Sequence, residues 1–136
     1  MIFLDTNVIS EPTRIRPDSN VVRWVKDHEG QSALSTVVLA ELSAGIERIK
    51  PDLRSKRLAG YFLKTRLQYA GRIYTFDEES ALIYGEIIGH AHRNGRIMKS
   101  PDAMIAAITL RHKATLATRN VVDFEFLKMK VVNPWA

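Results

Sequence analysis

Short apolar runs alternate with longer segments of helical periodicity along the whole chain, and this alternation restricts the fold more than any other feature. The apolar runs have the length of strands and lie at residues 2–5, 32–35, 72–76, 115–118 and 130–132. Helices are predicted between them at residues 18–28, 37–50, 53–69, 78–93 and 101–113, with a short helical turn at 120–127. Alternating strands and helices are typical of a three-layer α/β/α domain with a mostly parallel central sheet, here of four to five strands.

Capping signals predict several of the helix boundaries. Thr36 is predicted to cap the helix that follows it, and Asp77 a later one. Ser100 followed by Pro101 is typical of an N-cap and a first helical residue. Asn94-Gly95 predicts the end of the preceding helix, since glycine readily adopts the left-handed conformation found there.

The composition indicates one globular domain over residues 1–136, with 46% apolar residues. Because the chain has no cysteine, disulfides, thiolate zinc sites and cysteine nucleophiles are excluded. The sequence shows neither a signal peptide nor an apolar run of bilayer length, so we expect a cytoplasmic protein without a membrane partner. The formal net charge of +5 favours a polyanionic partner such as nucleic acid.

Three carboxylates lie in apolar surroundings, where an unpaired charge is costly. Asp5 ends the first apolar run, Glu41 lies inside Val37–Leu42, and Asp102 lies in the first turn of a predicted helix. The carboxyl ends of parallel strands meet at one edge of the sheet, and ligands bind there in open α/β folds. Three acids directed toward that edge indicate a site for a hard metal ion.

Each polar candidate also has a purely structural explanation. Asp5 could cap a turn or helix after the first strand, and Asp102 could favour the positive end of the helix dipole. Glu41 could pair with an arginine at the border of the core. Asn120 could be a helix cap, and Asp123 a solvated acid in a first helical turn.

Other kinds of site fit the sequence poorly. The four histidines are scattered, and His90 and His92 are two residues apart, which places them on different faces of a helix. The sequence contains no P-loop, no dinucleotide-binding glycine pattern and no nucleophile elbow. A site made only of oxygen ligands suits Mg²⁺ or Mn²⁺ better than zinc.

Several segments resemble the PIN-domain endoribonuclease toxins of the VapC family, and in particular the FitB-like branch. The similar segments, in chain order, are Leu4-Asp5-Thr6-Asn7-Val8-Ile9-Ser10-Glu11-Pro12, Ser35–Leu42, Asp102–Ala107, Leu116–Asn120 and Val132-Asn133-Pro134-Trp135. The resemblance spans almost the whole chain. The chain departs from the family pattern at the fourth acidic position, which holds Asn120, and Asp123 one turn further on could compensate.

The resemblance implies a Mg²⁺-dependent endoribonuclease, with Mn²⁺ as the other candidate ion, in which metal-activated water attacks the RNA phosphodiester bond. Asp5 and Asp102 are the implied metal ligands. Glu41 would bind a metal or orient the attacking water, and Asn120 would complete the site unless Asp123 replaces it. Lys99 and Arg119, and also Arg96, are expected to hold RNA phosphates, and Thr6 and Thr118 are expected to contact phosphate or to support the ligands.

The resemblance also implies partners for this chain. They are a small cognate antitoxin, the RNA substrate, operator DNA reached only through the antitoxin, and a second copy of the chain in a homodimer. Two alternatives stay open on the sequence: a catalytically weak PIN-like module that regulates by binding DNA or RNA with a partner, and a metal-dependent DNA nuclease or phosphatase. Asn120 is the residue that most favours the first alternative.

Overall fold

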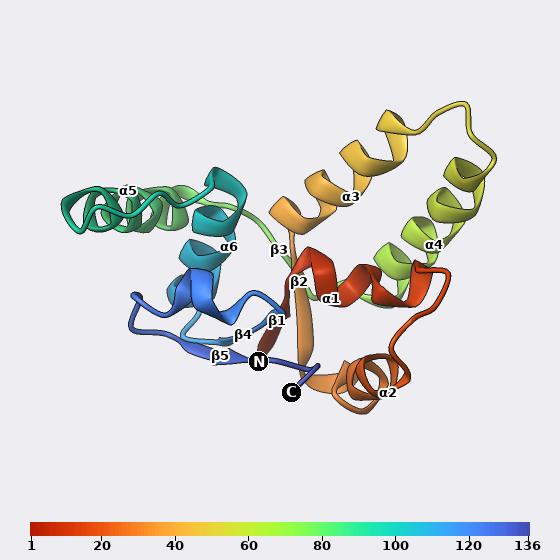
Figure 1. Cartoon of the computed structure of the whole chain (residues 1–136), viewed down its shortest axis with the longest axis horizontal. Coiled ribbons are helices and arrows are strands. Elements are labelled where there is room, and N and C mark those ends of the chain that lie inside the picture. The colour runs from red at the N-terminus through yellow and green to blue at the C-terminus, as the bar shows by residue number, and fades with distance from the viewer.

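Five parallel strands form the centre of the computed structural model, which describes all 136 residues (Figure 1). The strands are β1 (Ile2–Leu4), β2 (Ser32–Ser35), β3 (Ile73–Tyr74), β4 (Thr115–Ala117) and β5 (Lys130–Val132). Their order in the sheet is β3-β2-β1-β4-β5, and every neighbouring pair is parallel. The predicted α/β class with a parallel sheet is confirmed.

Helices lie on both sides of this sheet, as right-handed connections between parallel strands require. They are α1 (Thr6–Ser10), α2 (Ser19–Asp27), α3 (Thr36–Arg48), α4 (Arg54–Gln68), α5 (Glu78–Arg93) and α6 (Ser100–Arg111), with short 3₁₀ turns η1 (Glu11–Thr13), η2 (Glu29–Gln31) and η3 (Val121–Phe124). Figure 1 shows α2 and α4 on one side and the packed pair α5 and α6 on the other. None of these helices has both the length and the apolar character needed to cross a bilayer.

The order of the strands reverses at β1, and this reversal locates the site. The chain moves from β1 to β2 and β3 in one direction, and then returns to place β4 on the opposite side of β1. The pairs Ile2–Thr115 and Leu4–Ala117 hold β1 and β4 in register, so residues that follow the two strands emerge side by side. In doubly wound sheets, ligands bind in the crevice at such a reversal.

The buried core holds these strand ends in place. Phe3 and Leu4 of β1 and Leu116 of β4 are almost completely buried, as are residues 105–109 of α6. Because α6 is anchored along this length, the position of its first turn, which carries Asp102, is set by core packing.

Two predicted helix caps are wrong by one residue, and one helix was not predicted. Ser35 caps α3 by accepting a hydrogen bond from Val38 N, whereas the Thr36 hydroxyl accepts one from Phe76 N in a distant segment. Ser100 is already the first residue of α6. The helix α1 has only five residues and follows β1 without a loop, so it is too short to display helical periodicity. The predicted cap at Asp77 is confirmed, because its side chain accepts from Ser80 N.

Candidate active site

Asp5 is the most deeply buried acid of the site, with 4% of its surface exposed. It follows β1 in an extended conformation and its carboxylate accepts hydrogen bonds from Thr6 N at 2.8 Å and from Thr118 Oγ1 at 2.7 Å. Burial raises the pKa of this carboxyl, and the two hydrogen bonds oppose that shift. Asp5 therefore caps α1, as its structural explanation requires, and also presents a buried carboxylate at the strand reversal.

Thr118 ties the ends of β1 and β4 together beneath this carboxylate. Its hydroxyl donates to Asp5 and accepts from Asn120 N at 3.1 Å. Asn7 completes the link, because its side-chain oxygen accepts from Arg119 N at 3.3 Å. Thr118 is fully buried, so its hydroxyl cannot reach a phosphate in solvent. Of the two roles predicted for Thr118, support of a ligand or contact with phosphate, its hydroxyl has the first, because it donates to Asp5.

Asn7 was given no role from the sequence, although it lies two residues after Asp5 in the first motif. Its amide nitrogen lies 3.4 Å from both Asp5 Oδ2 and Thr118 Oγ1. The spacing from Asp5 was the only signal available, because the other partners of Asn7, Thr118 and Arg119, lie just after β4 and more than a hundred residues away.

Asp102 has the most strongly shifted pKa in this site. Burial raises its pKa from 3.8 to about 6, and repulsion from Asp5, Asp123 and Glu41 adds to the shift, while the Lys99 ammonium opposes it. The mutual repulsion shows that four carboxylates from β1, α3, α6 and η3 share one region. A cation placed among them would relieve that repulsion.

Glu41 enters the site from α3 and is half-buried. Its carboxylate accepts a hydrogen bond from Thr6 Oγ1 at 2.7 Å and forms no salt bridge. The structural explanation, a pair with an arginine, is therefore wrong. Thr6 and Thr118 are thus used in the same way, each donating its hydroxyl to one acid of the site.

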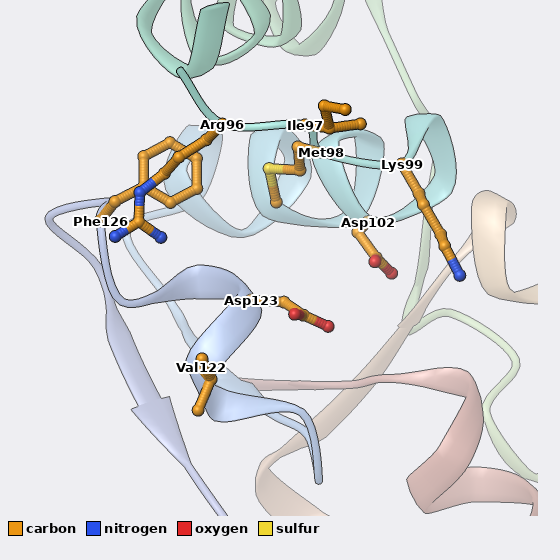
Figure 2. Close-up of a pocket in the computed structure, with 8 residues that line it drawn as sticks. All are labelled: Arg96, Ile97, Met98, Lys99, Asp102, Val122, Asp123 and Phe126. Carbon is orange, nitrogen blue, oxygen red and sulfur yellow. The ribbon is translucent and has the colours of Figure 1, made fainter. Parts of the chain in front are cut away.

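The alternative fourth acid, Asp123, is exposed to solvent but lies near the other carboxylates of the site. Figure 2 shows its side chain pointing toward that of Asp102 across a cavity of about 240 Å³, with Lys99 beside Asp102. Asp123 also raises the pKa values of both Asp5 and Asp102. Asn120 is exposed, and its side chain makes no hydrogen bond, so it does not cap η3.

Two of the three basic candidates, Lys99 and Arg96, line this cavity, and the third, Arg119, does not. Lys99 lines it next to Asp102, where its charge is available to an anion. Arg96 also lines it, with its guanidinium 5.0 Å from the ring centre of Phe126. Arg119 lies over Trp135 at 5.1 Å, just after β4. All three arise from segments at the carboxyl edge of the sheet.

One buried acid belongs to a different part of the chain. Glu11 of η1 has 2% of its surface exposed and accepts from Asp18 N and Arg14 Nη1, both at 3.4 Å. These contacts hold the loop that joins η1 to α2, so Glu11 is a structural residue.

The donor set fits a hard divalent cation. The carboxylates supply only oxygen atoms, and no cysteine or histidine takes part. No three acidic or histidine side chains are arranged as a ready-made metal cage. This agrees with the behaviour of Mg²⁺, which usually keeps several waters and is bound through one or two carboxylates.

We expect Asp102→Asn to stabilise the metal-free protein at neutral pH. A pKa raised from 3.8 to about 6 means that the folded state binds the proton more tightly than the unfolded chain, so the folded state loses stability as the pH rises from about 4 to about 6 and does not regain it above pH 6. A two-unit shift corresponds to at most about 2.7 kcal/mol, and to about 1 kcal/mol after allowance for the half-exposed carboxyl. This predicts a Tm about 4 °C above wild type at pH 7.5.

The gain should shrink as the pH falls through 6 and vanish below about pH 4, where the wild-type carboxyl is protonated in both states. Thermal unfolding in EDTA across this range measures it. The control is Glu86→Gln, which changes an exposed carboxylate on α5 that has no hydrogen bond or salt bridge. A gain in Tm that is equal at pH 4 and pH 7.5 would contradict the raised pKa of Asp102, to which burial and repulsion contribute.

Comparisons with known proteins agree with this geometry. The family model described as "PIN domain" matches residues 2–126. The chain is 38% identical to the plasmid stability protein StbB of Pseudomonas syringae and to the toxin FitB of Neisseria gonorrhoeae, over 99% of this chain and 99% of each relative. It is 33% identical to the VapC ribonuclease Y4jK of Sinorhizobium fredii, over 99% of this chain and 98% of that protein.

A solved structure extends the similarity to three dimensions. The structure of FitAB bound to an IR36 DNA fragment matches with a TM-score of 0.91 and 36% identity, covering 100% of this chain and 96% of that one.

Proposed function

Because the chain belongs to the PIN-domain family, we propose that it is a metal-dependent endoribonuclease and the toxin of a toxin–antitoxin pair. The observation that carries the proposal is the group of four carboxylates at the β1–β4 edge, where burial and the repulsion of the other three acids raise the pKa of Asp102 to about 6. Repelling acids are costly to hold together unless a cation and an anionic substrate use them.

Asp5 and Asp102 would hold the metal, because they are the most buried acid and the most strongly repelled acid of the site. Mg²⁺ is the ion that best suits the donors, and Mn²⁺ the second choice. A divalent cation bound here would activate water and stabilise negative charge on the phosphate under attack.

The remaining residues would orient the reactants. Glu41, fixed by Thr6 Oγ1, would hold the attacking water through its free oxygen and accept a proton from it. Lys99 would hold a phosphate oxygen beside Asp102, and Arg119 would hold another phosphate further along the RNA chain. No covalent nucleophile is required.

The direct test uses labelled RNA and labelled DNA of the same sequence, each with Mg²⁺ and with EDTA. RNA cleavage that requires Mg²⁺ supports the proposal. Cleavage of DNA alone would favour the metal-dependent DNA nuclease. Tight binding without cleavage would favour the interaction module, which the asparagine at position 120 supports.

We also propose a small cognate antitoxin that covers the acidic site, with a homodimer of this chain in the complex and operator DNA bound only through the antitoxin. The matched solved structure is that of FitAB bound to an IR36 DNA fragment. An arginine or a charged helix of the partner would suit the acids. An apolar cavity of about 100 Å³ lies between α3 and α4, with Leu42, Ile46, Leu58 and Phe62 in its lining. It would take an apolar face of the same partner.

Co-expression with the neighbouring short open reading frame is expected to give a stable complex with suppressed nuclease activity. Phe62→Asp should release that activity, because it places a charge in the apolar cavity. Leu82→Asp, which changes an exposed apolar side chain on α5, is the control and should leave the complex intact. A wild-type chain that is harmless when expressed alone and does not bind its neighbour would contradict the toxin assignment.

A further inference from the structure

The cavity beside the carboxylates has a second half that the cleavage chemistry does not use. One end carries Asp102, Asp123 and Lys99. The other end is apolar and aromatic, and it is lined by Arg96, Ile97, Met98, Val122 and Phe126. Figure 2 shows Arg96 and Phe126 close together on the side of the cavity away from Lys99. Ile97 is fully exposed and Val122 is 67% exposed at its rim.

The Arg96 guanidinium lies over the Phe126 ring at this end of the cavity. The guanidinium lies 5.0 Å from the centre of the ring, and the His90 ring is nearly parallel to that of Phe126, at 14° and 5.6 Å. Arg96 has no carboxylate partner within the chain. Guanidinium and aromatic planes of this kind are surfaces on which unstacked nucleobases lie.

The backbone along one wall of the cavity offers free hydrogen-bond donors. Residues 96–99 connect α5 to α6 without regular structure. Arg96 N donates to Ala91 O. The next three backbone amides donate to no acceptor within the chain; they are those of Ile97, Met98 and Lys99. Amides beside a stacking surface can bond the edge of a flat ring, as base recognition requires.

We propose that this end of the cavity binds one unstacked nucleobase of the RNA, next to the phosphodiester bond that the carboxylates face. The inference rests on the proposed endoribonuclease function. The cavity of about 240 Å³ is smaller than the roughly 300–1,000 Å³ of pockets for drug-sized ligands, so it suits a single base. Its continuity with Asp102 and Lys99 favours a nucleotide adjacent to the cleaved bond. Single-stranded or looped RNA is the substrate class, because a paired base cannot enter.

The test compares an intact RNA with abasic versions that each lack one base. The intact RNA is short and single-stranded with one cleavage site, and the abasic versions have an abasic nucleotide beside the cleaved bond, placed on each side in turn. Wild type, Arg96→Ala and Phe126→Leu are compared by kcat/KM, together with Lys128→Ala. Lys128→Ala removes an exposed charge outside the cavity, and Phe126→Leu keeps apolar bulk but removes the ring.

Loss of base stacking is expected to lower kcat/KM by roughly 5- to 100-fold. Arg96→Ala and Phe126→Leu should each show such a loss on the intact RNA and almost none on the abasic RNA. The wild-type protein should lose activity on only one of the two abasic RNAs, the one that lacks the base on the side of the bond that the cavity binds. Phe126→Trp should restore the rate on intact RNA, and Lys128→Ala should resemble wild type on both substrates.

A second measurement does not depend on cleavage. The test RNA carries 2-aminopurine at the same position. Its fluorescence should be quenched when the wild-type protein binds it in EDTA, and should not be quenched when the Phe126→Leu protein binds it. Equal losses on intact and abasic RNA, or no quenching by wild type, would overturn the inference and leave the nuclease assignment standing. A wild-type chain that cleaves no RNA with Mg²⁺ would overturn the proposed function, and this inference with it.

Discussion

Asp102→Asn is expected to reduce RNA cleavage by more than about 100-fold, and Asp5→Asn by a similar factor. Groups that only support a metal ligand typically cost 10- to 100-fold in activity when removed, and a carboxylate that holds the ion should cost more. Both substitutions keep the shape of the side chain. Asparagine at position 5 can still accept from Thr6 N through Oδ1, and its Nδ2 can donate to Thr118 Oγ1 where the second carboxylate oxygen of Asp5 accepted, so the fold should survive.

Single-turnover cleavage of labelled RNA at saturating Mg²⁺ measures this effect, and thermal unfolding shows that each variant is folded. Glu86→Gln, a change of the same kind at an exposed position on α5, should cleave at the wild-type rate. Growth inhibition in the expressing cells should disappear with the activity. An Asp102→Asn protein that cleaves RNA as fast as wild type would remove Asp102 from the metal site.

The fourth acid gives the second large effect. We expect Asp123→Ala to lower the cleavage rate by about 10- to 100-fold at limiting Mg²⁺, because Asp123 faces Asp102 and repels both Asp5 and Asp102. Asn120→Ala should stay much closer to wild type, because the Asn120 side chain is exposed and does not cap η3 with a hydrogen bond. Asn120→Asp should tighten metal binding, since it adds a charge.

Titration of Mg²⁺ against the cleavage rate separates these variants, and Glu125→Ala, an exposed acid two residues away, is the matched control. If Asp123 is only a first-turn acid, its loss should cost about 0.3–1 kcal/mol of stability and no activity. An Asp123→Ala protein that follows the wild-type curve at every Mg²⁺ concentration would exclude it from the site.

The fold could be predicted from the sequence because its longer helices display their periodicity and short apolar runs separate them. Residues 32–35 and 130–132 form strands as predicted, and the capping signal at Asp77 is used as predicted. The errors lie where a side chain serves a distant segment. Thr36 could cap α3 by local rules, but its hydroxyl binds Phe76 N, forty residues away, and Ser35 takes the cap.

The candidate site could be predicted in part for the same reason. Asp5, Glu41 and Asp102 were identified because an acid in an apolar run is conspicuous in a sequence. The function of Asn7 was not predicted, and the choice between the two roles predicted for Thr118 was left open, since their hydrogen bonds join residues more than a hundred positions apart. Burial alone decides that Thr118 supports Asp5 and does not contact a phosphate.

The sequence by itself determined the alternation of strands and helices, the carboxylates that end up at one edge of the sheet, and the absence of sulfur chemistry. These depend on local periodicity and composition, which a linear reading contains. Only the tertiary structure decided that β4 lies beside β1, that Asp123 faces Asp102, and that Arg96 lies over Phe126. Such contacts arise from the packing of α6 and the strand order, because both bring together residues that no short-range pattern relates.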